Sequence, residues 1–552
     1  MRREMTVTRG HIWPVCLLLI CGISPGASAQ NLSFDIARLI EEGTIAGIQV
    51  PGARIFDLTL DDAIERALER NLDIAVERLN PQISDLSIAQ ADSVFLPSLS
   101  SNFDVGRSLS PSRSQLDGAG QLTQQAVEAN SGNADVAVEQ AVKWYGGRYS
   151  VGWDNGRTET NNVFFSFNPS YSSNVALSYT QPLLRGFSID TQRRQLRVSQ
   201  INRDISDIDL RETISNTLAD VRRAYWDLVY AKGSVDVQQQ ALDLAEQLVQ
   251  DNRARVEIGT LAPIDIIQAQ SEAAGRRQSL AEAEQLLHTS ELSLKQLIVN
   301  GTGDEMWNAE LVAIDRPVLN QEPIDLEAAI KNALDVRTDV SRTRSQQDIN
   351  DVTVRNLRND TLPSLDLVGS FRLQGQGGTQ LISPFLGGPS MLVIPGGYSD
   401  AIDHLVDAEY PMWNVQLQLT YPLGRSSQRA AHARAQLQVQ QTSAQIRQLE
   451  LQIATEVTNA ALQIESIQKR TEAARAARDL SEDQLDAEQS KFEVGLSTNF
   501  FVVQAQRDLA TAQDTELRAI LDYQNAVIEF ERVQRTSLTR AGISIVTGGG
   551  GN

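Results

Sequence analysis

Cysteine is nearly absent from the sequence, and its two cysteines, Cys16 and Cys21, both lie in the N-terminal segment that precedes Gln30. Three arginines precede the apolar run that contains them, and the small residues Ala27 and Ala29 follow it. This order is typical of a secretory signal peptide, so we expect removal of residues 1–29. The exported chain then has no cysteine, which excludes disulfides, thiol catalysis and cysteine-based metal sites.

Long apolar runs, positive charge and aromatic residues are also scarce. Beyond the signal peptide no apolar run approaches the roughly 20 residues of a membrane helix, so residence in a membrane would have to use β-strands. The formal net charge is −21, the opposite of what a nucleic-acid-binding protein needs. Aromatic residues make up only 5% of the chain, which favours long packed helices over compact domains with aromatic cores.

Proline is missing from three long spans, at residues 183–262, 264–315 and 423–552. Glycine is missing from residues 425–494 as well. Spans without these two helix breakers predict continuous helices. A helix from Phe187 to about Arg255 would be ~100 Å long at ~1.5 Å per residue, far longer than a globular domain needs.

Alternating apolar and polar residues predict half-buried strands in two regions, about residues 97–182 and 363–423. Residues 415–419, with the sequence VQLQL, are an example. Polar stretches rich in Gly and Ser, at residues 108–135 and 374–410, are expected to form exposed loops between the strands.

The sequence also predicts an internal duplication. Three matches carry it: Leu-Pro-Ser-Leu at 96–99 and 362–365, Pro-Leu at 182–183 and 422–423, and residues 257–270 with 493–506. The numbering offset between the copies falls along the chain from the first match to the last, so the first strand region is the longer of the two. Each copy contains short helices, strands, and a long helical hairpin around a glycine turn.

These patterns divide the chain into consecutive parts. We expect a signal peptide at 1–29, an N-terminal extension at 30–56, a first repeat at 57–300, a linker at 301–322, a second repeat at 323–536 and a tail at 537–552. The long helical hairpins are expected at about 187–300 and 425–536.

Two strand pairs give about four strands per chain, which is too few for one chain to close a barrel. An open sheet edge cannot face lipid, because its unpaired N–H and C=O groups cost several kcal/mol each. Several copies of the chain must then contribute to one barrel.

The order of three motifs resembles the TolC family of outer-membrane efflux proteins. The motifs are Leu-Pro-Ser-Leu before a strand, Gln-Pro-Leu-Leu-Arg-Gly at 181–186, and Val-Gly-Leu-Ser at 494–497, and the resemblance covers about residues 57–536. It implies an α+β membrane protein, a homotrimer with a 12-stranded β-barrel that continues as a long periplasmic α-helical barrel. It also implies the outer-membrane channel of a tripartite efflux pump or type I secretion system, with a periplasmic adaptor and an inner-membrane transporter as partners.

In that family the turns of the helical hairpins contact the adaptor. The resemblance places these turns at Ile258, Gly259 and Thr260, and at Val494, Gly495, Leu496 and Ser497. The first turn departs from the family pattern, because Thr260 stands where the second copy has Leu496. An alternative interpretation of both glycines is that they only end a helix.

Family members narrow the periplasmic end with acidic residues just after the second turn, whereas this chain has Phe501 and Gln504 there. We hypothesise an apolar periplasmic gate at Phe501, since rings around a threefold axis would exclude water. The alternative is that Phe500 and Phe501 pack between helices.

Signatures of catalysis are missing from the sequence. The histidines of the exported chain, His288, His404 and His432, have no metal-ligand spacing, and there is no phosphate loop and no Gly-x-Ser-x-Gly motif. We therefore expect no enzyme, no cofactor and no metal site. Two rival interpretations are a non-conducting periplasmic coiled-coil protein and a general porin, which would need strands along most of the chain.

Overall fold

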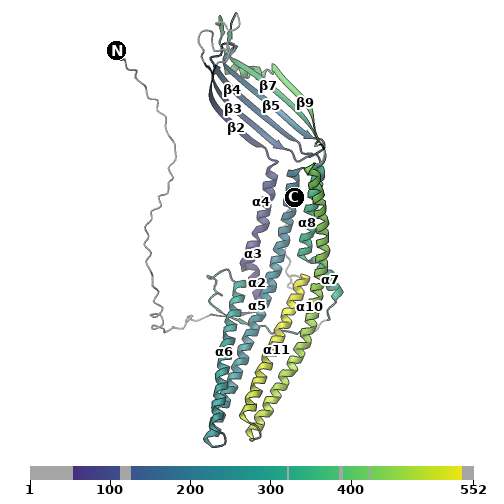
Figure 1. Cartoon of the computed structure of the whole chain (residues 1–552). Helices are drawn as coiled ribbons and strands as arrows, with labels where there is room; N and C mark the ends of the chain where they lie inside the picture. The colour runs from purple at the N-terminus through teal and green to yellow at the C-terminus, as the bar shows by residue number, and fades with distance from the viewer. Residues whose placement is uncertain are drawn as a thin grey trace, which may run out of the picture. The chain divides into compact units, whose positions relative to one another are not determined.

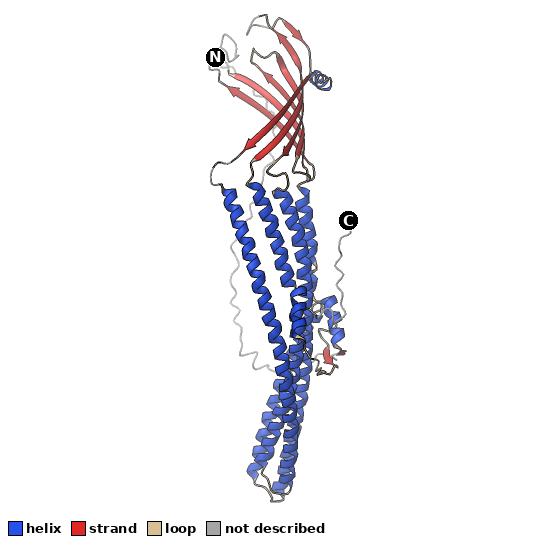
Figure 2. Cartoon of the chain, turned by 90° about the vertical axis from the view of Figure 1, so that its right-hand side faces the viewer, coloured by secondary structure: helices blue, strands red, loops and turns tan. Residues whose placement is uncertain are grey.

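The structure is a computed structural model and describes residues 54–111, 126–319, 323–384, 390–421, 423 and 426–536. The expected signal peptide, most of the N-terminal extension and the C-terminal tail lie outside these residues. Within them, a twisted β-sheet lies at one end of a set of long helices (Figure 1), and a side view shows the helices running lengthwise away from the strands (Figure 2).

Two helical hairpins form the end away from the sheet. They consist of α5 (Thr191–Glu257) with α6 (Pro263–Ile298), and of α10 (Ser427–Glu493) with α11 (Asn499–Gln534). The side chains of Asp190 and Ser426 cap the starts of α5 and α10. Both α5 and α10 contain 67 residues, and both α6 and α11 contain 36. The two hairpins therefore reach the same depth.

Shorter helices lead into the strands of each copy. These are α2 (Leu60–Arg70), α3 (Leu72–Glu77) and α4 (Leu79–Ser93) in the first copy, and α7 (Leu326–Val336) and α8 (Thr338–Asp360) in the second. Below the sheet, α4, α5, α8 and α10 lie side by side in that order. None of the helices in the described part of the chain is both long and apolar enough to cross a bilayer.

Six long antiparallel strands form the sheet. In spatial order they are β2 (Ser98–Ser110), β3 (Val127–Ala141), β4 (Arg148–Thr160), β5 (Phe167–Pro182), β7 (Ser364–Ile382) and β9 (Tyr410–Thr420). A seventh, short strand, β8 (Leu392–Ile394), pairs with the end of β7. The expectation of about four strands per chain is therefore wrong. The missed strand β3 begins inside the stretch expected as a loop at 108–135, because its first half consists of small and polar residues.

The other expected loop, at 374–410, is also partly wrong. It contains the end of β7, all of β8 and the helix α9 (Tyr398–Val406). The glycines of this stretch let α9 approach the sheet: a Cβ atom at Gly375 would lie 1.8 Å from the carbonyl oxygen of Ala401. Here glycine marks close packing of a helix on a strand rather than an exposed loop.

The two faces of the sheet differ in polarity across all six long strands. Directly paired residues share a face, and one row of such pairs is apolar: Leu99, Val138, Val151, Leu177, Phe371 and Trp413. A neighbouring row on the opposite face is polar: Ser98, Glu139, Ser150, Ser178, Ser370 and Asn414. This alternation is typical of strands with lipid on one side and water on the other.

A small parallel sheet ties the N-terminal end of the described chain to the segment between the copies. In it β1 (Ile55–Leu58) pairs with β6 (Glu310–Ala313), which lies in the expected linker. The hydroxyl of Tyr225 on α5 is 3.0 Å from the carbonyl oxygen of Leu58 and 2.8 Å from Oδ2 of Asp315. Burial raises the pKa of this hydroxyl, so it stays protonated and donates at neutral pH.

The Tyr225→Phe variant tests this connection. Loss of the hydroxyl removes its hydrogen bonds to Leu58 and Asp315 and leaves the N–H of Asp315 without this acceptor, so we expect destabilisation of about 1–3 kcal/mol in a denaturant-unfolding measurement. Tyr410→Phe is the control, because Tyr410 is 52% exposed on the edge strand β9. Equal unfolding midpoints for Tyr225→Phe and the unaltered protein would contradict this assignment.

Candidate functional site at the hairpin turns

The first hairpin turn has a compact hydrogen-bonded form. Gly259 adopts a left-handed conformation with φ +80°, its N–H donates to the carbonyl of Val256 at 3.0 Å, and the N–H of Thr260 donates to the carbonyl of Arg255 at 2.9 Å. This pair of bonds is the Schellman motif that ends a helix at a glycine.

The second turn repeats this geometry in the second copy. Gly495 has φ +79°, its N–H donates to Phe492 at 3.2 Å, and the N–H of Leu496 donates to Lys491 at 2.8 Å. The interpretation that both glycines end helices is therefore correct as a statement of geometry.

The two turns present different side chains to solvent. In the second turn Val494 is 69% and Leu496 81% exposed, so two apolar side chains stand free in this chain. In the first turn Ile258 is 75% exposed, but the hydroxyl of Thr260 donates back to the carbonyl of Arg255 at 2.9 Å. The second turn is thus the more apolar of the two.

The side chain of Ser497 links the second turn to α10. Its hydroxyl donates to Oε2 of Glu488 at 2.7 Å, and the ammonium group of Lys491 lies 2.6 Å from Oε1 of the same carboxylate. Lys491 and Ser497 together lower the pKa of Glu488. The turn therefore carries an ionised carboxylate next to its apolar residues.

Contacts near the turns hold the two hairpins together. The amide of Asn252 donates to Oδ1 of Asn499 at 2.8 Å, and both side chains are buried. Nη1 of Arg255 donates to the carbonyl of Phe492 at 3.0 Å, and its guanidinium group lies 4.6 Å from the centre of the Phe492 ring. These contacts leave no signal in the sequence, because the partners are far apart along the chain and belong to different repeats.

A buried carboxylate joins the hairpins further along. Glu272 on α6 accepts hydrogen bonds of 2.9 Å from Arg276 and from Arg507 on α11. Burial alone would raise the pKa of Glu272, but the two guanidinium groups outweigh it and lower the pKa below its ordinary value. This contact is therefore fully formed at neutral pH and weakens as the pH falls through the lowered pKa.

The hypothesised gate residues lie on the exposed side of α11. Phe500 and Phe501 are 55% and 54% exposed and contact each other edge to face at 5.6 Å, whereas the next residues, Val502 and Val503, are buried against the first hairpin. The amide of Gln504 donates to Asp508 at 2.8 Å. Neither phenylalanine ring belongs to the core of this single chain.

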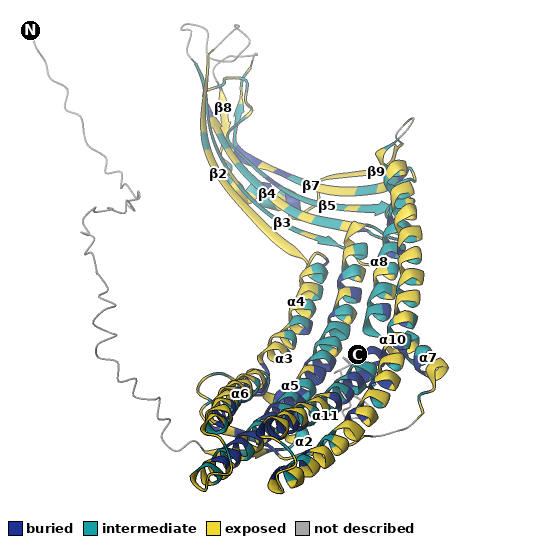
Figure 3. Ribbon diagram, turned by 60° about the horizontal axis from the view of Figure 1, so that its bottom comes forward, coloured by how far each residue is buried: buried dark blue, intermediate teal, exposed yellow. Residues whose placement is uncertain are grey.

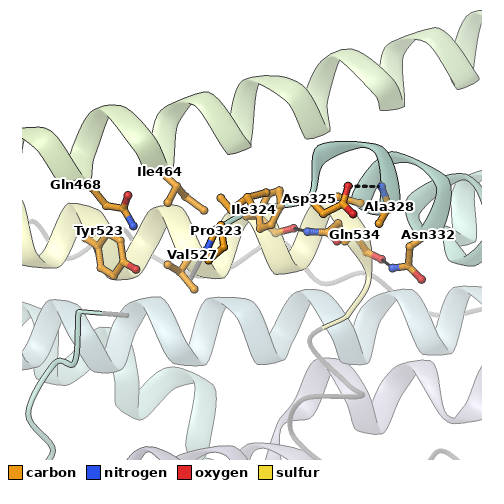
Figure 4. A pocket seen from close by; sticks show the side chains of 12 residues that line it. Pro323, Ile324, Asp325, Ala328, Asn332, Ile464, Gln468, Tyr523, Val527 and Gln534 are labelled. Atoms are coloured by element: carbon orange, nitrogen blue, oxygen red, sulfur yellow. Dashed lines mark hydrogen bonds between the residues drawn. The ribbon is translucent and has the colours of Figure 1, made fainter. Parts of the chain in front are cut away.

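A pocket of ≈ 380 Å³ lies between α7, α10 and α11, with Ile464, Tyr523 and Val527 among its lining residues (Figure 4). Its one charged lining residue, Asp325, accepts the N–H of Ala328 and so caps α7. Across the described residues, no three His, Asp or Glu side chains come together as a metal site would require. The pocket is a hollow of the helix packing, lined mainly by apolar and amide side chains.

Comparison with known proteins identifies the class. The family model described as outer membrane efflux protein matches residues 63–300 and 329–533. The chain therefore belongs to the outer membrane efflux protein family. It is an outer-membrane efflux channel of the kind used by tripartite pumps, and members of this family are transporters rather than enzymes. The predicted family, function and location are confirmed, and the non-conducting coiled-coil alternative has no support.

Solved structures share the fold at low sequence identity. They include the CmeC outer membrane channel of Campylobacter jejuni (14% identity, TM-score 0.61, 86% of this chain and 85% of that chain). The others are VceC of Vibrio cholerae (14%, 0.59, 86% and 95%) and the open state of the MtrE outer membrane channel of Neisseria gonorrhoeae (17%, 0.56, 86% and 88%). A search of curated proteins found no significant match.

Two glycine substitutions test the geometry of the turns. Gly495→Ala forces an L-residue into the left-handed region, so we expect destabilisation of about 1–2 kcal/mol. Gly275→Ala is the matched control, because Gly275 lies in the helix α6 with open space around its Cβ position. It should stabilise the protein by about 0.5–1 kcal/mol. Equal signs for the two changes in denaturant unfolding would argue against the strained turn.

Proposed function

We propose that three copies of this chain form one closed channel, with the sheets in the outer membrane and the helices as a tunnel in the periplasm. Signal-peptide removal after Ala29 and two repeats at 57–300 and 323–536 belong to this proposal. An inner-membrane transporter supplies the substrate through a periplasmic adaptor that docks on the hairpin turns. The observation that carries the proposal is the six-stranded sheet with one apolar face, one polar face and two open edges.

The open edges require a partner. The edge strands β2 and β9 are exposed along almost their whole length, while the strands between them are mostly half-buried (Figure 3). In lipid, each unpaired N–H and C=O group of such an edge costs several kcal/mol. Six alternating strands place β2 and β9 in opposite directions, so an edge of one copy fits the other edge of the next copy as an antiparallel pair.

The helices below the sheet lack neighbours at the same two edges. Val352 on α8 is 4% exposed, whereas its counterpart in the first repeat, Leu86 on α4, is 71% exposed. Ile201 on α5 is 5% exposed, whereas its counterpart in the second repeat, Leu437 on α10, is 65% exposed. Apolar positions that are buried inside the chain are thus open at its edges, which supports packing of α4 against α10 of another copy.

The exposed edge of α3 and α4 has the spacing of a helix-packing surface. Leu72, Val76, Leu79, Ile83 and Leu86 follow one another at intervals of three and four positions, and each is more than half exposed. The number of copies, three, comes from the resemblance to the TolC family. Purification from outer membranes tests it: we expect a trimer that conducts ions in planar bilayers, and conducting monomers would refute it.

The turn variants test adaptor docking. Leu496→Asp places a charge where the apolar contact is expected, so efflux of a fluorescent dye from cells should be nearly abolished while trimers remain intact. Thr260→Asp at the matching position of the first turn should have a smaller effect, because Thr260 is already polar. Normal dye efflux and normal adaptor crosslinking in the Leu496→Asp variant would count against docking at this turn.

The proposed periplasmic gate at Phe501 and Gln504 is tested by conductance. Phe501→Ser and Phe501→Asp should raise the closed-state conductance in planar bilayers, because a polar side chain lets water fill an apolar constriction. Trimer stability should not change. Ile267→Ser, at another exposed apolar position near the turns, is the control. A loss of trimer stability with unchanged conductance would show instead that Phe501 packs between helices.

A further inference from the structure

The first copy of the duplication contains one strand pair more than the second. The additional strands β3 and β4 are not an appendage, because they lie between β2 and β5. β3 is paired without interruption both with β2 and with β4. Their connecting turn is anchored at the helical end of the sheet. There the Tyr145 ring stacks on Phe187 at 4.7 Å, and the amide of Gln181 donates to the carbonyl of Tyr145 at 2.8 Å.

The width of the six long strands, taken together as one wall of the proposed barrel, fits the four helices below them. Four helices side by side, spaced ~8–10 Å apart, span about 32–40 Å. Six strands spaced ~4.8 Å apart and tilted by ~35–45° span about 35–41 Å. Four strands would span only about 23–27 Å at the same spacing and tilt. Six strands thus match the width of the four helices that they join.

The internal duplication provides a template for the contact between copies of the chain. Within the chain, the last strand of the first repeat, β5, pairs with the first strand of the second repeat, β7. The corresponding elements stand at the two open edges. β9 corresponds to β5 through the match of Pro182 with Pro422, and β2 corresponds to β7 through the match of Pro97 with Pro363. The register of β5 on β7 therefore predicts the register of β9 on β2 of the next copy.

Transfer of this register gives specific pairs. Leu177 pairs with Phe371 within the chain, so Leu417 should pair with Val105 of the next copy. In the same way, the observed pair of Tyr179 and Gly369 predicts that Leu419 pairs with Phe103 of the next copy. The observed pair of Ser178 and Ser370 predicts that Gln418 pairs with Asp104. In these three pairs the transferred register places apolar opposite apolar and polar opposite polar residues, whereas the outer pair, Val415 with Arg107, is mixed. A shift by one residue would put apolar opposite polar side chains.

The exposure of these residues also fits a missing neighbour. Leu417 is 61% and Val105 90% exposed, whereas their counterparts in the paired strands, Leu177 and Phe371, are 46% and 42% exposed. Leu417 and Val105 are therefore more exposed than the corresponding residues in the complete pair of β5 and β7.

We propose that each copy contributes six strands rather than four, and that β9 of one copy pairs with β2 of the next with Leu417 opposite Val105. The inference rests on the proposed assembly of three copies, which then close a wall of eighteen long strands, six from each chain. Because barrel diameter grows roughly in proportion to strand number, this wall is about 1.5 times as wide as one of twelve strands.

Cysteine crosslinking tests the proposal on the full trimer. The only native cysteines precede Gln30, so introduced pairs are read without background from the mature chain. In the double variant Leu417→Cys/Val105→Cys, oxidation should convert most chains into covalent dimers and trimers on non-reducing gels. The control Leu417→Cys/Asp104→Cys places the two thiols on opposite faces and should crosslink poorly. Each single variant should still form trimers on native gels.

A third double variant tests whether the barrel wall omits β2 and β3. Arg157 on β4 lies in the same row as Val105, because both pair with Gly132 on β3. If β2 and β3 were excluded from the wall, Leu417→Cys/Arg157→Cys would crosslink in place of Leu417→Cys/Val105→Cys. Trimers that give this result, or that crosslink neither pair, overturn the six-strand wall and leave the trimeric channel standing. Absence of any trimer would overturn both.

Discussion

Every backbone N–H and C=O group that faces lipid must have a hydrogen-bond partner, and this constraint governs the sheet of this protein and what lies beneath it. One chain satisfies it for the inner strands and leaves β2 and β9 open. At the same two edges, α4 lies next to β2 in the chain and α10 next to β9, and both helices expose apolar side chains. The strands and the helices therefore lack neighbours on the same two sides of the chain. In the proposed assembly, the contact between copies in the membrane therefore continues along the tunnel.

Different contacts hold the two helical hairpins together near their turns. Near the turns a small apolar cluster that includes Leu248, Phe492 and Val502 joins the two hairpins, and specific polar contacts between them add to it. The buried pair Asn252 and Asn499, the packing of Arg255 on Phe492, and the bridge from Arg507 to Glu272 each link one hairpin to the other. A buried amide or carboxylate that loses its partner is costly, so the hairpins resist sliding along each other. The two turns are consequently held as a pair, as the proposed docking of an adaptor requires.

The sequence predicted the helices and turns better than the sheet. Missing proline and glycine indicate long helices directly, and a duplicated glycine marks each turn, so α5, α10, Gly259 and Gly495 lie where the pattern placed them. The strand β3 escaped notice because a wall strand with water on one face alternates small and polar residues, as in its first half. α9 was missed because Gly375 and Gly377 indicate a loop until the packing of Ala401 on them is seen. Contacts between the two repeats, such as Asn252 with Asn499, leave no local pattern.

α5 is as long as α10, and α6 is as long as α11. These equal lengths limit which insertions and deletions the helices tolerate. One residue inserted into α5 alone would lower the first turn by ~1.5 Å and rotate everything beyond it by about 100°. The Asn252 and Arg255 side chains would then face away from Asn499 and Phe492. Length changes in the helices are therefore acceptable only as matched events in both repeats, whereas the strand region of the first repeat contains an entire additional hairpin. Insertions and deletions should accordingly accumulate in the strand region and be rare in the two long helical hairpins.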